Sequence, residues 1–339
     1  MTEEQSTASH LSVVMTTSIT GINTMVPSTS PRGIEFYFHC AVLIIGVVGT
    51  VANGLILYAL VVSNQHKKHP LIVNQNILDL CSSFAMTLSY IMKLCGIYLT
   101  GSFGKFVCIV LLSDVLIWLA NSGAVINLAL VTIERYLKVV HNNNKLRKWM
   151  IHSALPIPWV FGLMETIISV ASRYPGTILT EGVCYTRVIF LNNAARIIFV
   201  IWSLSVYYFI IILIFGFCYW RILIVVRRQA RVMAGHRAAG SNAGQAQLNQ
   251  IQTNVIKTMI LVCVLYTLLW LPTNVAFILV YAHPYPLPLE RLYYTTVFMG
   301  YSYMSINPFI YAIKFNPVKQ VLLRMIPCKN TNEGNAGGV

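Results

Sequence analysis

Seven apolar runs, each long enough to cross a lipid bilayer, constrain the fold more than any other feature of this sequence. A transmembrane helix needs about 20 apolar residues in succession. Backbone N–H and C=O groups inside lipid must be paired within their own segment, and runs of this length pair them as helices rather than as the alternating strands of a barrel. The runs cover residues 36–62, 71–94, 106–137, 150–172, 197–220, 259–282 and 292–313.

Composition supports a lipid environment for most of the chain. Of its 339 residues, 56% are hydrophobic and only 10% are charged, whereas soluble domains carry about 25% charged residues. The predicted fold class is an all-α membrane protein: a seven-transmembrane-helix bundle with a short amphipathic C-terminal helix. The expected divisions are an extracellular disordered N-terminus (1–35), the seven-helix transmembrane domain (36–314), the amphipathic surface helix (315–327) and a cytoplasmic tail (328–339).

The net charge of +14 is concentrated on one side of the predicted bundle. Seventeen of the 24 Lys and Arg residues fall in segments 63–71, 135–149, 221–257 and 314–329, which share one side if the helices alternate in direction. The positive-inside rule makes that side cytoplasmic. We therefore expect a multi-pass plasma-membrane protein with its N-terminus outside and its C-terminus inside. The basic segments are expected to face anionic membrane lipid rather than nucleic acid.

Ionisable and amide side chains within the apolar runs are candidates for function. Asp79 lies inside the second run, and Glu134-Arg135-Tyr136 ends the third. A charge at mid-bilayer costs about 2.5–3.5 kcal/mol, so such residues usually face protein or water. Asn53 is a plausible partner for Asp79, although both side chains could simply be hydrogen-bonded packing residues. Gly49, four residues before Asn53, favours close helix packing.

Two of the eight cysteines lie at the predicted outer boundary, where the compartment is oxidising. These are Cys108, at the start of the third run, and Cys184, in the loop after the fourth. We expect a disulfide between them. Cys328, in the inner tail, is either a palmitoylation site or a free thiol.

An ordered set of motifs, nearly one for each run, resembles the rhodopsin-like (class A) G protein-coupled receptors. Any one motif is weak, but their order along residues 36 to about 328 is specific. The set comprises Asn53, Asp79, Cys108 with Cys184, Glu134-Arg135-Tyr136, Trp159, Trp270-Leu271-Pro272 and Asn307-Pro308-Phe309-Ile310-Tyr311.

The resemblance implies a switch at the inner end of the third run. Arg135 would be held by Glu134 at rest and released to meet a heterotrimeric G protein on activation. Tyr219 and Tyr311 would then move towards Arg135. Arrestin is the other expected cytoplasmic partner.

The resemblance also implies a ligand pocket above Trp270. Pro272 and Pro308 each remove a helix hydrogen bond and introduce a kink. The inner half of the sixth helix is therefore expected to move outward on activation. Asp79, Asn53 and Asn307 would form a polar cluster at mid-membrane.

Departures from the family pattern carry further expectations. Cys108 precedes Arg135 by 27 residues, about two more than the family usually has, which leaves the register of that outer end open. The acid that often clamps the arginine is missing, since the sequence there reads Gln252-Thr253-Asn254. We therefore expect basal signalling without ligand. Ala124, Tyr303 and Met304 replace polar residues around Asp79, so no strong sodium site is expected. No other metal and no cofactor is expected either.

The ligand is constrained by a few positions. Tyr301 stands where opsins carry the retinal lysine, which excludes a Schiff base. Ile117 stands where amine receptors carry an aspartate, but Asp114 lies one turn further out and Glu165 lies in the outer half of the fourth run. The two carboxylates favour an amine-like or peptide ligand with a cationic group. The alternative is that both are bonded to neighbouring helices.

The sequence is less consistent with other functions than with a receptor. A transporter would show repeated halves, and no repeat is visible; a non-signalling seven-helix membrane protein is the remaining alternative. The eight histidines are scattered without metal-ligand spacing, so enzymatic activity is not expected. Residues 234–252, rich in Ala, Gly, Asn and Gln, are typical of a flexible link.

Overall fold

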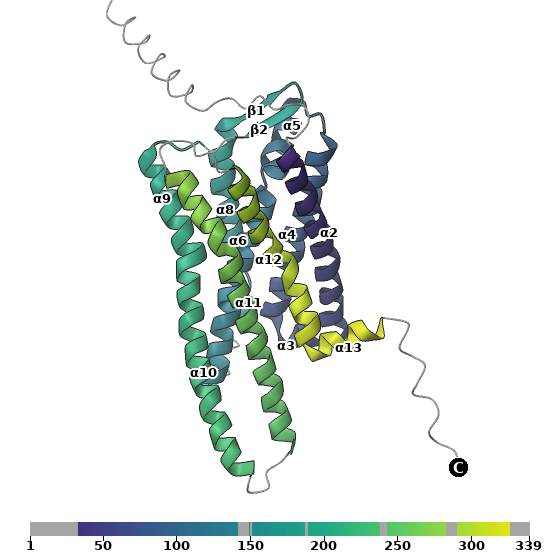
Figure 1. Ribbon diagram of the computed structural model, residues 1–339, viewed down its shortest axis with the longest axis vertical. Coiled ribbons are helices and arrows are strands. Elements are labelled where there is room, and N and C mark those ends of the chain that lie inside the picture. The colour runs from purple at the N-terminus through teal and green to yellow at the C-terminus, as the bar shows by residue number, and fades with distance from the viewer. Residues whose placement is uncertain are drawn as a thin grey trace, which may run out of the picture.

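The chain folds into a bundle of membrane-length helices, seen in a computed structural model that describes residues 33–141, 149, 151–186, 189–237, 243–282 and 290–325 (Figure 1). The predicted helical membrane bundle is confirmed. Within the described residues, six helical segments are long and apolar enough to cross a membrane: Gly33–Val62, Pro70–Cys95, Gly101–His141, Ile151–Gly176, Asn193–Gln229 and Ile256–Leu279.

The seventh predicted run corresponds to α12 (Glu290–Lys314). This helix has membrane length, but its Tyr, Thr, Ser and Asn residues make it more polar than the six segments above. The helices of the first six runs are α2 (Gly33–Val62), α4 (Pro70–Cys95), α5 (Gly101–Val107) continued by α6 (Val115–Tyr136), α8 (Ile157–Arg173), α9 (Asn193–Leu204) continued by α10 (Ile210–Arg237), and α11 (Ala243–Ala282).

Helix α6 lies in the middle of the bundle, in contact with α4, α8 and α10, while α2 packs against α4 and α12. Small residues permit the closest approaches. A Cβ added at Gly49 would lie 2.4 Å from Ser305 Oγ and 2.5 Å from Ser83 Oγ. At Gly162 it would lie 2.5 Å from the carbonyl oxygen of Leu119. These contacts fit the packing role expected of small residues in membrane helices.

The helix of the third run is interrupted near its start. Cys108–Leu112 forms a π-helical turn, η1, and Asp114 then adopts a left-handed backbone conformation with φ 62°. A π-turn contains more residues than an α-turn, and the break at Asp114 restarts the helix. These two features accommodate the additional residues between Cys108 and Arg135. Two further π-turns are η2 (Leu137–His141) and η4 (Ser205–Phe209).

A two-stranded hairpin lies across one end of the bundle (Figure 1). Strand β1 (Thr177–Thr180) pairs antiparallel with β2 (Val183–Thr186), after the 3-10 turn η3 (Tyr174–Gly176). Glu181 and Gly182 form the turn with φ 51° and 78°, the positive values that two-residue hairpins require. A Cβ at Gly182 would lie 2.1 Å from the Tyr98 ring, so only glycine fits. We call the end of the bundle that carries this hairpin the disulfide end.

The opposite end, which we call the Arg135 end, carries the short helices α3 (Gln65–Lys68) and α13 (Asn316–Arg324). Helix α13 runs sideways from the end of α12, and α10 and α11 project beyond the other helices (Figure 1). Helix α10 continues to Arg237 and α11 begins at Ala243. The flexible link expected over residues 234–252 is therefore wrong for its described residues, 234–237 and 243–252, which are helical.

Candidate functional site

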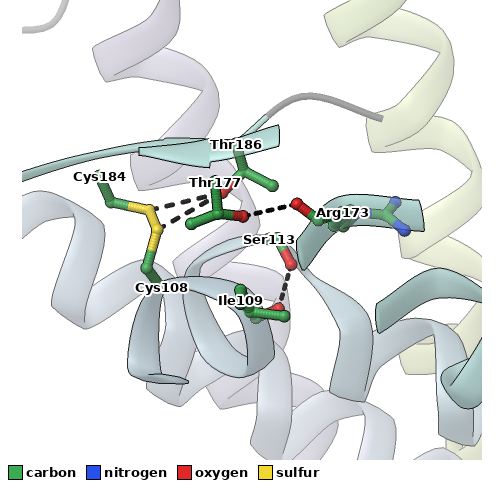
Figure 2. The surroundings of a disulfide bond; sticks show 7 residues. All are labelled: Cys108, Ile109, Ser113, Arg173, Thr177, Cys184 and Thr186. Atoms are coloured by element: carbon green, nitrogen blue, oxygen red, sulfur yellow. Dashed lines mark hydrogen bonds between the residues drawn. A yellow bond between two sulfur atoms is a disulfide. The ribbon is translucent and has the colours of Figure 1, made fainter. Parts of the chain in front are cut away.

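The hairpin is fixed to the bundle by a disulfide between Cys108 and Cys184, as expected. Their Cα atoms are 5.7 Å apart, and Cys108 is fully buried. Figure 2 shows the Thr186 hydroxyl beside both sulfurs, 3.4 Å from that of Cys108 and 3.6 Å from that of Cys184. It also shows Ser113 donating to the Ile109 carbonyl within the π-turn. The bond thus joins β2 to the irregular start of the third run.

Asp114 forms the centre of a polar cluster at the disulfide end. Its Oδ1 lies 2.7 Å from the Lys93 ammonium. Its Oδ2 accepts hydrogen bonds from the hydroxyls of Tyr90, at 3.2 Å, and Tyr301, at 3.3 Å. Lys93 was not predicted from the sequence as a partner of Asp114, although it is a charged residue in the last turn of an apolar run. A cationic ligand at Asp114 therefore has to compete with Lys93.

Glu165 has a separate partner. Its Oε2 accepts a hydrogen bond of 3.4 Å from the Tyr207 hydroxyl of η4. The structure thus joins each of the two carboxylates to a neighbouring helix, which was the alternative to a shared cationic site.

Aromatic rings pack below the Asp114 cluster. The Trp270 ring lies 5.9 Å from the Trp118 ring and 6.4 Å from the Tyr266 ring, measured between centroids. The Trp118 ring is in turn 6.3 Å from that of Tyr301. Ile117 is fully buried in the same core. The sequence pointed to Ile117 and not to the next residue, Trp118, whose side chain faces a different direction on the helix.

Asp79 is completely buried and bonded to two amides. Asn307 Nδ2 donates to one carboxylate oxygen at 2.9 Å, and Gln75 Nε2 donates to the other at 3.2 Å. The expected pairing of Asn53 with Asp79 is replaced, since Asn53 accepts from Asn76 at 3.0 Å and donates to the carbonyls of Gly49 and Met304. Gln75 lies one helical turn before Asp79 in the same helix, and its amide takes the hydrogen-bonding position expected of Asn53.

Gln75 also connects Asp79 to a chain of buried amides that the sequence reasoning missed. The Trp159 indole donates to Asn74 Oδ1 at 3.0 Å, and Asn74 donates to Asn127 at 2.9 Å. Asn127 donates to Gln75 Oε1 at 3.0 Å. Hydrogen bonds therefore run without a break from α8 through α4 and α6 to Asp79 and, through Asn307, to α12.

Arg135 is buried at the opposite end, with 4% of its surface exposed. Its Nε lies 3.2 Å from Glu134 Oε2, and its Nη2 lies 3.0 Å from His69 Nδ1. His69 lies between α3 and α4, and its ring also packs edge-on against the Phe315 ring, at 5.8 Å between centroids. Lys68 and other residues line a small hollow that reaches Glu134 and Arg135. His69 thus connects the arginine to the junction of α12 and α13.

The family model described as "7 transmembrane receptor (rhodopsin family)" matches residues 52–311, which is more than half of the chain. The chain belongs to the rhodopsin family of seven-transmembrane receptors. The matched region includes every family motif from Asn53 to Tyr311, and it establishes this chain as a multi-pass membrane receptor. The family is one of receptors rather than enzymes.

Two tyrosines of this rhodopsin-family receptor, Tyr219 and Tyr136, contact neighbouring helices at the Arg135 end. Tyr219 lies within 3.3 Å of the Thr132 hydroxyl and 3.7 Å of the Cys263 sulfur, so it joins α10 to α6 and α11. Tyr136 packs against Phe217 of α10, at 5.7 Å between ring centroids.

Helix α12 carries the remaining residues for which the sequence predicts a switch role. Pro308 lies inside this helix, between the buried Asn307 and the buried Tyr311. Pro272 likewise lies inside α11. Both helices thus contain an internal position without a backbone donor, as expected for two helices that bend.

Some expected features fall outside the described residues. Cys328 is one of them, and the side chains of residues 252–254, where the family often carries a clamping acid, are others. Among the residues that the structure does describe, no group of three or more His, Cys, Asp or Glu side chains could hold a metal ion.

Proposed function

We propose that this receptor binds an extracellular ligand at the disulfide end and activates a heterotrimeric G protein at the Arg135 end. The observation that carries the proposal is the buried Arg135 guanidinium, held by Glu134 and His69. Such a group has little structural purpose at a helix end, because burial of an arginine costs free energy. It is suited to be released and to bind a partner.

The proposed orientation places the disulfide end outside the cell and the Arg135 end in the cytoplasm of a plasma-membrane protein. A disulfide persists in an oxidising compartment. The segments rich in Lys and Arg all follow or precede helix ends on the Arg135 side, as the positive-inside rule requires for cytoplasmic loops. Arrestin and anionic lipid are proposed as further partners of this basic face.

Helix α11 is the proposed moving element. Trp270 lies two residues before Pro272 and packs against Trp118 of α6. A ligand that displaces the Trp118 ring would therefore act directly on the bend of α11 at Pro272. Movement of the inner half of α11 would separate Cys263 from Tyr219. The Tyr219 hydroxyl would then be free to approach Arg135. Two discrete packings of α11 make this a two-state switch.

The resting state is proposed to depend on His69. Arg135 donates to Nδ1 of this histidine, so Nδ1 carries no proton and the ring is neutral. A hydrogen bond to a neutral ring holds the arginine less firmly than the carboxylate that many relatives place on the sixth helix. Measurable basal signalling is the expected consequence.

Nucleotide exchange on purified heterotrimers tests the proposal. The receptor is placed in lipid nanodiscs with a panel of G proteins, and ligand-independent exchange is compared between the natural chain and Arg135→Ala. We expect at least a tenfold loss, while Arg291→Ala, an exposed arginine at the start of α12, retains the natural rate. An unchanged rate in Arg135→Ala, or no exchange with any heterotrimer, would contradict it.

A further inference from the structure

The Asp114 cluster restricts the charge of any ligand that enters it. Asp114 and Lys93 come from different helices and form a direct ion pair of 2.7 Å, with 19% and 17% of their side chains exposed. The pair is thus accessible but largely enclosed. Two tyrosine hydroxyls complete the hydrogen bonding of the carboxylate. The Lys93 ammonium also lies 4.1 Å from the centre of the Tyr90 ring.

A ligand with a single charge is poorly matched to this pair. An amine that binds Asp114 has to displace Lys93 and leaves that ammonium without its counter-ion. An acid that binds Lys93 leaves Asp114 in the same position. An uncompensated charge in an enclosed site is costly, so either ligand loses much of what its own ion pair contributes.

A ligand with both charges avoids this loss. Standard bond lengths place the ammonium nitrogen and the nearer carboxylate oxygen of an α-amino acid about 3 Å apart, close to the 2.7 Å of the Lys93–Asp114 pair. The two dipolar pairs can therefore lie antiparallel, with each charge facing an opposite one. Adjacent apolar contact is available too, because Tyr301 touches both Asp114 and the Trp118 ring.

We propose that the receptor takes a zwitterionic ligand with an amino-acid head group, its ammonium on Asp114 and its carboxylate on Lys93. Its apolar or aromatic side chain packs on the half-buried Trp118 ring, which lies against the buried Trp270. This inference rests on the proposed function for its signalling consequence, but the binding itself requires no G protein.

The test uses four probes that share one ring and differ in head group: tryptophan, tryptamine, indole-3-propionate and indole. Binding to the purified full-length receptor is measured by titration calorimetry and by thermal shift, without G protein. A parallel series uses phenylalanine, phenethylamine and 3-phenylpropionate. We expect the amino acid of at least one series to bind at least tenfold more tightly than its amine or its acid.

Two variants should reverse the preference in opposite directions. Lys93→Met should favour the amine over the amino acid, and Asp114→Asn should favour the acid. Lys105→Met is the matched control, since its ammonium also lies over a tyrosine ring, 4.4 Å from that of Tyr174, without an ion pair to Asp114. The control should keep the natural ranking of head groups.

The proposal is overturned if amine and amino acid bind the natural receptor equally, if both variants affect all head groups alike, or if no probe in either series binds. Basal nucleotide exchange is recorded on the same preparations. Head-group selectivity without any exchange would leave this inference standing and contradict the proposed function. Exchange without selectivity would do the reverse.

Discussion

The two ends of the third transmembrane segment each carry an ion pair, and the pairs are built differently. At the disulfide end, Asp114 pairs with Lys93 across two helices. At the Arg135 end, Arg135 pairs with Glu134, its neighbour in sequence. A pair between neighbours on one helix cannot hold two helices together. Arg135 contacts a second segment through His69, between α3 and α4.

This difference suggests which end is rigid. The disulfide end combines a covalent bond, a charged interhelical pair and a hairpin whose Gly182 carbonyl accepts from the Leu99 amide. The Arg135 end depends on hydrogen bonds to a histidine ring and to tyrosine hydroxyls. Such bonds contribute about 0.5–1.5 kcal/mol each, or about 1.5–3 kcal/mol where one partner is charged. We infer that the Arg135 end opens while the disulfide end stays closed.

The largest effect is expected from removal of the disulfide. Cys108→Ala frees a loop closed over a sequence separation of 76 residues, and chain entropy predicts a destabilisation of about 4 kcal/mol. The melting temperature of the purified receptor measures it. Cys95→Ala, at an exposed free cysteine near the same end, serves as the control and should change little. Equal losses in the two variants would contradict a rigid disulfide end.

The ion pair should give the next largest effect. Lys93→Met or Asp114→Asn alone should each destabilise the receptor by about 1–3 kcal/mol, because each leaves an enclosed partner unsatisfied and solvent screens only part of the cost. The double variant should recover much of the loss, since it leaves neither charge alone. Thermal unfolding of all four proteins gives the coupling energy. Additive losses would show that the two side chains do not act together.

A smaller effect is expected at His69, and it should appear in signalling rather than in stability. His69→Ala removes one hydrogen bond to the charged Arg135, but the arginine keeps its ion pair with Glu134, so we expect the resting state to lose about 1.5 kcal/mol. Basal nucleotide exchange should therefore rise about tenfold. His66→Ala, three residues earlier in the short helix α3, is the matched control and should leave the rate unchanged. A lower basal rate in His69→Ala would reverse the role assigned to this residue.

The smallest effect is expected at Gln75, which connects Asn127 to Asp79 in the chain of buried amides. Gln75→Leu keeps the volume but removes the donor to Asp79 and the acceptor for Asn127. Because Asn127 retains the Leu71 carbonyl and Asp79 retains Asn307, we expect a loss of about 1 kcal/mol. Thermal unfolding measures it, with Gln65→Leu, on the short helix α3, as control. A loss as large as that of Cys108→Ala would show that the buried amide chain, rather than the disulfide end, is the rigid part of the molecule.

Much of the fold was predictable because the lipid requirement acts on whole segments. The apolar runs locate the helices, and the motif order identifies the family, without any knowledge of helix rotation. Individual partners depend on that rotation. Lys93, His69 and Gln75 were missed for this reason, although each is a polar residue in or beside an apolar run.

The start of the third segment shows a second limit. The sequence indicates about two additional residues before Arg135, but not where they are accommodated. The structure places them in the π-turn at Cys108–Leu112 and in the left-handed Asp114. A local defect of this kind decides which side chain meets Lys93, and no periodicity in the sequence marks it.

The most direct measurement compares the motion of the two ends in one molecule. Spin labels at the exposed Lys67 and Lys257 report on the Arg135 end, and labels at the exposed Phe103 and Ile178 report on the disulfide end. Electron–electron distances are recorded in nanodiscs with and without a nucleotide-free G protein. We predict that the first distance lengthens by about 5 Å or more and that the second is unchanged. A fixed distance between Lys67 and Lys257, or a change confined to the disulfide end, would contradict the account.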